Sequence, residues 1–182
     1  MLWWDKRKLD EVQLEADTAV RSLARPWRLE DVRQALSRNF DMDIALAPWS
    51  TPEQAEHAGL FGSCGGMTVV SKHAIAVRYD SRRSPAHQCR QICHEFGHLQ
   101  AGHHLQVGEC SKTRNIPPEL VSDLDLGKVG FVLSGDSFAF NRDIFTAPEE
   151  LDAERRGMIL AAGLAGGVEG GRWSIAGATL GD

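Results

Sequence analysis

The sequence predicts an α+β fold in which a small antiparallel or mixed sheet packs on helices. Three observations predict it, in chain order. Apolar residues recur at spacings of three and four near the N-terminus, short β-prone runs follow, and a helical pattern returns from residue 85. Helices and strands that are grouped in this way, instead of alternating along the chain, are typical of an α+β plan. A length of 182 residues suffices for one domain with a substantial core.

The N-terminal part predicts two amphipathic helices, one over residues 5–24, ending near Pro26, and a second over residues 29–40. Their connection lacks the glycine turn of a helix-turn-helix, so we do not predict a DNA-reading module here. The arginines of this region are interleaved with acidic residues, and the formal net charge is -5. These charges argue against direct nucleic-acid binding. The apolar stripes consist of Leu9, Val12, Ala16, Ala19, Val20 and Leu23, and of Leu29, Val32, Ala35, Leu36 and Phe40.

Three short β-prone runs follow, at residues 44–47, 67–70 and 74–79, with a glycine-rich turn region at 59–66. Because only residues 71–73 separate the last two runs, we expect them to form a hairpin. An edge strand of such a sheet can bind an extended peptide as an additional strand. An ordinary structural hairpin is the alternative.

A helix is predicted to begin at Pro85. Ser84 can cap its N-terminus, and proline is well suited to the first helical position. The apolar stripe is Cys89, Ile92, Cys93, Phe96 and Leu99, and Gly102 can end the helix in the left-handed conformation.

This helix contains an H-E-x-x-H motif formed by His94, Glu95 and His98. The spacing places both imidazoles on one helix face, where one tetrahedral zinc can bind a nitrogen from each. Glu95 is then placed to accept a proton from a zinc-activated water, as the general base of a zinc peptidase. Gly97, between the two histidines, would let another segment approach closely; an incidental weak spot in the helix is the alternative. The motif is the arrangement of a zinc peptidase.

A catalytic zinc normally takes three protein ligands, and two routes can supply the third. His104 lies six residues after His98, as in a longer zinc motif, but the glycine of that motif is displaced by one position. The favoured route is a carboxylate of a later helix, Glu150, with Asp152 next. Glu154, one turn after Glu150, is then placed to accept a hydrogen bond from a ligand histidine.

The predicted organisation is a single metallopeptidase-like domain over residues 1–165, followed by a glycine-rich tail over 166–182. We expect a cytoplasmic protein, because the N-terminus shows no secretory signal and the chain has no run of about 18 apolar residues. Four cysteines fit that compartment as thiols. Within the domain we expect N-terminal helices at 1–40, the sheet and motif helix at 41–104, a long connection or flap at 105–147 and a final helix at 148–165.

The segment from Val77 to His103 resembles the ImmA/IrrE family of bacterial metallo-endopeptidases. The shared features are a strand, a helix-opening Ser-Pro turn, H-E-F-G-H-L and a following Gly-His pair. The resemblance implies a gluzincin-like core with zinc bound by His94, His98 and an acidic residue, and Glu95 as general base. It also implies a protein substrate, a DNA-binding transcriptional repressor, with manganese as a substitute metal.

Two departures from the family pattern stand out. The last helix carries Arg156-Gly157 where the family usually has Phe-Ala, and no Met-Pro pair follows Leu160. The expected function is a zinc-dependent endopeptidase that cleaves a repressor or a similar regulatory protein. The alternative is a non-proteolytic zinc-binding regulator or toxin-antitoxin component that acts by binding a repressor.

Overall fold

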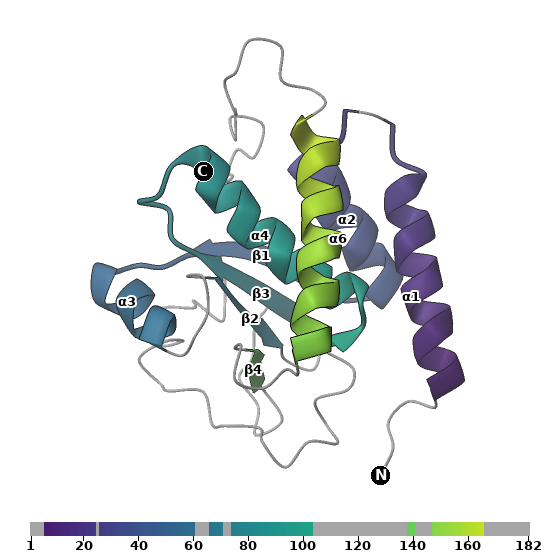
Figure 1. The fold of residues 1–182 in the computed structure, drawn as a ribbon, viewed down its shortest axis with the longest axis horizontal. Helices are drawn as coiled ribbons and strands as arrows, with labels where there is room; N and C mark the ends of the chain where they lie inside the picture. Colours follow the sequence, from purple (N-terminus) through teal and green to yellow (C-terminus); the bar gives the residue numbers. More distant parts are fainter. Residues whose placement is uncertain are drawn as a thin grey trace.

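The computed structural model describes residues 6–24, 26–60, 66–70, 74–103, 138–140 and 147–165. Five helices and four strands are defined within these ranges, which confirms the predicted α+β class (Figure 1). In chain order they are α1 (Lys6–Arg21), α2 (Leu29–Phe40), β1 (Asp43–Pro48), α3 (Pro52–Leu60), β2 (Met67–Val70), β3 (Ala74–Tyr79), α4 (Pro85–Gln100), β4 (Phe138–Phe140) and α6 (Ala147–Ala165).

The four strands form one mixed sheet with the order β1-β3-β2-β4. Strand β1 runs parallel to β3, whereas β2 is antiparallel to both β3 and β4. The antiparallel β2-β3 pair agrees with the predicted hairpin, although its connection lies outside the described residues. Every residue of β2 and β3 is buried, as expected for the two central strands.

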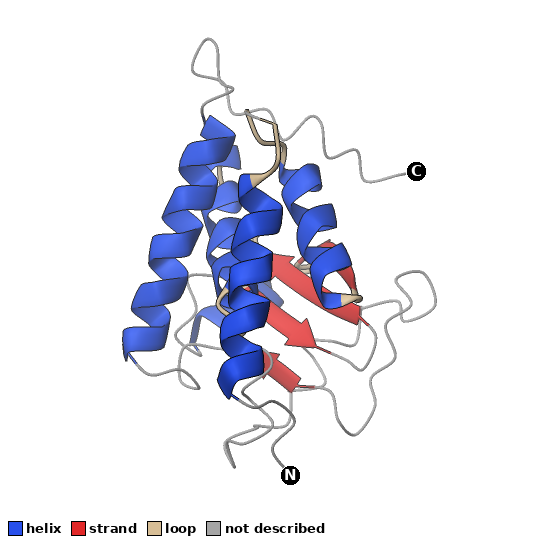
Figure 2. Cartoon of the chain, turned by 90° about the vertical axis from the view of Figure 1, so that its right-hand side faces the viewer, coloured by secondary structure: helices blue, strands red, loops and turns tan. Residues whose placement is uncertain are grey.

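Helix α4 occupies the centre of the helical layer, and Figure 2 shows the helices gathered beside the sheet. It contacts β3 on one side and α6 on the other, and also contacts α1 and α2. Its apolar stripe enters the hydrophobic core, where Phe96 and Leu99 are fully buried. The end of α4 is held by Gln13 of α1, whose Nε2 donates to the carbonyl oxygen of Ala101 at 2.6 Å. The helix that carries the H-E-x-x-H motif is therefore fixed on several sides.

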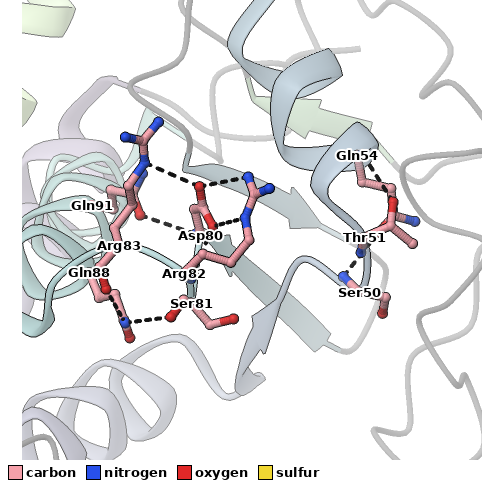
Figure 3. Close-up of polar contacts among 9 residues, drawn as sticks. All are labelled: Ser50, Thr51, Gln54, Asp80, Ser81, Arg82, Arg83, Gln88 and Gln91. Atoms are coloured by element: carbon pink, nitrogen blue, oxygen red, sulfur yellow. Dashed lines mark hydrogen bonds and ion pairs between the residues drawn. The ribbon is translucent and has the colours of Figure 1, made fainter.

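The turn from β3 into α4 is held by the buried carboxylate of Asp80 (Figure 3). Arg82 donates to it from Nε at 2.8 Å and from its backbone N–H at 3.1 Å, and Arg83 donates at 3.2 Å. Gln91, about one turn before the first motif histidine, accepts the backbone N–H of Asp80 at 3.1 Å. Hydrogen bonds from Arg82 lower the pKa of Asp80 and outweigh the effect of burial, and the positive charges of Arg82 and Arg83 act in the same direction. These bonds set the position of α4 relative to the sheet.

Helix α3 was not predicted; the sequence indicated only a turn region at 59–66, which overlaps its last two residues. The missed signal is a capping box at Thr51-Pro52-Glu53-Gln54. Thr51 Oγ1 accepts from the Gln54 backbone N–H at 3.3 Å, and Gln54 Oε1 accepts from the backbone N–H of Ser50 at 3.0 Å (Figure 3). The helix lacks a strong apolar stripe, which is why periodicity did not reveal it.

The predicted helices at 29–40 and 148–165 are confirmed within a residue at each end, and the first helix ends at Arg21, before Pro26. Most of the expected flap at 105–147 and the tail at 166–182 lie outside the described residues. No helix among the described ranges combines the length and the apolar composition that crossing a membrane requires.

Candidate metal site

The motif histidines lie on a helix whose start follows the sequence prediction. Ser84 caps α4 by accepting the backbone N–H of His87, and Pro85 occupies the first turn. Gly102 has a φ of 68° directly after the helix, as expected for a left-handed end. With the helix in this register, His94 and His98 project from the same face, one turn apart.

Three ligand atoms from two helices converge on one point. The Nε2 atoms of His94 and His98 are 3.1 Å apart. Glu150, in the first turn of α6, places Oε2 at 3.6 Å from His94 Nε2 and Oε1 at 3.5 Å from His98 Nε2. Counting one ligand atom from each side chain, the atoms lie within 4.8 Å of one another, so this group could hold a metal ion.

The spacing of these atoms can be compared with that of a real metal centre. Zinc binds histidine nitrogen and carboxylate oxygen at about 2.0–2.1 Å, so two ligands of a tetrahedral site lie about 3.3 Å apart. The two imidazole nitrogens are 3.1 Å apart, which is close to this value. Each carboxylate oxygen of Glu150 also lies near this distance from one histidine, Oε2 at 3.6 Å from His94 Nε2 and Oε1 at 3.5 Å from His98 Nε2. The two imidazoles and the carboxylate are therefore spaced as ligands of one metal ion would be.

Both histidines are oriented by hydrogen bonds on the nitrogen that faces away from the cluster. His94 Nδ1 lies 3.1 Å from Glu154 Oε2, and His98 Nδ1 lies 2.9 Å from His103 Nδ1. A carboxylate can only accept, so Nδ1 of His94 carries the proton and its Nε2 lone pair is left for a metal. Such partners hold a ligand imidazole in the metal-binding tautomer.

Electrostatics favour the same protonation state. Burial, together with the neighbouring imidazoles of His94 and His103, lowers the pKa of His98 to about 2, so this ring is neutral near pH 7. Burial would raise the pKa of Glu154, but hydrogen bonds from Arg90 and His94 lower it. Glu154 therefore stays ionised and remains an acceptor.

Glu95 lies on the side of α4 that faces the sheet and is only 4% exposed. Thr68 of β2 donates from Oγ1 to Glu95 Oε2 at 2.7 Å. Burial raises the pKa of Glu95 to about 7, assisted by the charge of Glu150 and opposed by His94 and Thr68. A carboxyl group with a pKa near 7 can exchange a proton at neutral pH, which is what a general base requires.

Helices α4 and α6 pack closely because small residues meet at their interface. A Cβ added to Gly97 would lie 2.2 Å from the carbonyl oxygen of Ala153, and one added to Gly157 would lie 2.9 Å from that of Cys93. Ala153 itself is fully buried. The contact agrees with the close approach of another segment that was expected at Gly97. It also gives a structural reason for the glycine at position 157, where the family usually has alanine. The close approach brings Glu150 to the two histidines.

Gly97→Ala is expected to destabilise the protein, although alanine in an open helix would stabilise it by about 1 kcal/mol. The added methyl group overlaps the backbone of α6, and overpacking of this kind costs about 1–3 kcal/mol. Urea denaturation of the metal-stripped protein measures the change. A more stable variant would show that the helices are not in contact at Gly97.

The other candidate ligands and site residues are less well placed or lie outside the described residues. Asp152, predicted as the alternative to Glu150, is turned toward Arg156, which donates to it at 3.0 Å. Arg156 also pairs with Asp17 of α1 at 2.5 Å, so the arginine of the Arg156-Gly157 departure ties α6 to α1. His104 lies outside the described residues. Sequence reasoning missed Thr68, which belongs to no recognisable motif, and the contact of His103 with His98, because the Gly-His pair does not by itself show what its histidine touches.

No family model, curated protein or solved structure matches this chain.

Proposed function

We propose that this protein is a zinc-dependent endopeptidase. The observation that carries the proposal is the convergence of His94, His98 and Glu150 beside the buried carboxyl group of Glu95. Two imidazoles and one carboxylate on adjacent helices are the ligand set of a gluzincin-like site, which leaves a fourth position for water or substrate.

The donor set favours zinc, with manganese as a substitute. Imidazole nitrogens suit zinc well, whereas magnesium and calcium prefer sites made of oxygen atoms alone. A zinc ion held by these residues would polarise a scissile carbonyl and lower the pKa of a water molecule. His98 serves as a neutral ligand because burial lowers its pKa to about 2, and the hydrogen bond of His94 Nδ1 to Glu154 leaves the Nε2 lone pair of His94 for the metal.

Glu95 performs the proton transfers in this proposal. Its carboxylate accepts a proton from the attacking water and passes it to the amine that leaves. Thr68 fixes one carboxylate oxygen by its hydrogen bond at 2.7 Å, so the other oxygen is held in a defined orientation. Burial of the carboxyl group keeps competing water away and matches its pKa to neutral pH.

The proposed substrate is a regulatory protein, a DNA-binding repressor of the kind cleaved by ImmA/IrrE peptidases. Support for this comes from the H-E-F-G-H-L segment, the preceding Ser-Pro turn and the Gly-His pair after it. The position of Glu150 adds support, because the departures in the last helix left the acidic ligand open and the geometry now favours this residue over Asp152.

The test uses the purified full chain, zinc or manganese, and the product of the neighbouring gene as the candidate repressor. Cleavage is expected with the wild-type protein, to be abolished by a chelator, and to fall by at least roughly 100-fold in Glu95→Gln, as expected for loss of a general base. The same variant should retain stoichiometric metal. Cleavage by Glu95→Gln at the wild-type rate would overturn the mechanism. Binding of the repressor without cleavage by the wild-type protein would favour the non-proteolytic alternative.

A further inference from the structure

A pair of buried thiols lies on α4 immediately before the motif histidines. Cys89 and Cys93 are reduced, are 4% and 1% exposed, and stand one turn apart with their sulfur atoms separated by 3.8 Å. Membership of the apolar stripe explains why the two cysteines are buried, but it does not explain why their sulfur atoms face each other. Neither thiol has a part in the proposed peptidase chemistry.

The separation of the sulfur atoms is that of a chelating pair. Two thiolates bound to one tetrahedral ion at about 2.3 Å lie about 3.8 Å apart, which is the distance observed. Thiolates prefer soft ions, unlike the imidazole and carboxylate groups of the first site. The two sites therefore differ in their donor atoms, and the thiol pair is the one suited to soft ions.

Cys89 borders a cavity of about 400 Å³ between α4 and α6, and Cys93 lies behind it, with its sulfur atom 3.8 Å from that of Cys89. Cys89 lines this cavity together with the apolar side chains of Ala86, Met158 and Ala161, and Met158 is 63% exposed at its edge. Gly157 lines the cavity on the α6 side. An ion bound by the thiols could thus carry an apolar substituent into the cavity.

We propose that Cys89 and Cys93 form a second site, a dithiol that chelates a soft, thiophilic metal or metalloid ion, with trivalent arsenic as the representative species. An As(III) oxide or hydroxide condenses with the two thiols: two As–S bonds form, the thiol protons leave with the displaced oxygen as water, and no oxidation occurs. The site shares a cavity wall with His94 and Glu154, so an ion bound there lies next to the first site. The proposal does not depend on peptidase activity.

Phenylarsine oxide is the probe, used on the full, metal-stripped and reduced protein. Its arsenic bridges two thiols with the release of one water, and its phenyl ring suits the apolar cavity. Intact-mass measurement is expected to show one phenylarsine per chain, displaced by a competing dithiol but not by a monothiol. Because the second thiol binds within the same molecule, Cys89→Ser and Cys93→Ser should each bind roughly 100-fold more weakly.

The double variant Cys64→Ser/Cys110→Ser is the matched control, because it removes the other two cysteines and should bind as the wild type does. Protection of Cys89 and Cys93 from alkylation in the wild-type adduct, located by peptide mapping, tests the site without any substitution. Protection of Cys64 or Cys110 instead would overturn the proposal. The proposal would also be overturned if the wild type bound phenylarsine oxide no more tightly than Cys89→Ser or Cys93→Ser does.

Discussion

Glu150→Gln is expected to abolish stoichiometric metal binding while leaving the fold intact. Glutamine keeps the shape of the side chain but removes the negative charge that faces His94 and His98 at 3.6 and 3.5 Å. Loss of a residue that merely orients a ligand costs roughly 10- to 100-fold in metal affinity, and loss of a charged ligand should exceed this. Competition with a chromophoric chelator measures the affinity.

Asp152→Asn provides a matched control. It removes one carboxylate from the same helix, two residues further on, but this carboxylate binds Arg156 and not the cluster. We expect its zinc affinity to stay close to that of the wild type. Equal losses in both variants would indicate a general charge effect, and a loss confined to Asp152→Asn would assign the third ligand to Asp152.

The second prediction concerns the stability of the metal-free protein. Burial raises the pKa of Glu95 from 4.5 to about 7, so between these values the folded protein holds a proton that the unfolded chain has released. Glu95 therefore contributes stability at low pH that is lost as the pH rises through about 7. This pKa shift corresponds to about 3 kcal/mol of unfolding free energy.

His98 acts in the opposite direction and must be separated from Glu95. Its lowered pKa means that the folded state resists protonation, so its contribution is lost as the pH falls below 6.5. The difference in unfolding free energy between the wild type and Glu95→Gln isolates Glu95, because both proteins contain His98. Urea denaturation with EDTA should show the wild type losing about 3 kcal/mol relative to Glu95→Gln between pH 4.5 and 8. A constant difference would mean that Glu95 is not buried in its protonated form.

Much of this fold could be predicted from local patterns in the sequence. The stripe of Cys89, Ile92 and Phe96, with the Ser84-Pro85 cap, defined α4 because helix periodicity and capping act over a few residues. The strands at 67–70 and 74–79 followed from their β-prone composition. Helix α3 escaped because its capping box was not considered and its apolar stripe is weak.

The site depended on contacts that join distant parts of the chain. The motif gave His94 and His98, but the choice between Glu150 and Asp152 depends on how α6 is rotated against α4. That rotation is set by the close contact of Gly97 with Ala153, which a single sequence does not specify. Thr68 lies 27 residues from Glu95 in the sequence, and only the pairing of β2 with β3 brings it to the carboxylate.

Anomalous diffraction at the zinc absorption edge, from crystals of the zinc-loaded protein, tests the central claim most directly. The account predicts one strong peak at about 2.0–2.1 Å from His94 Nε2, His98 Nε2 and a carboxylate oxygen of Glu150. A principal peak held by other ligands, or no peak between α4 and α6, would contradict it.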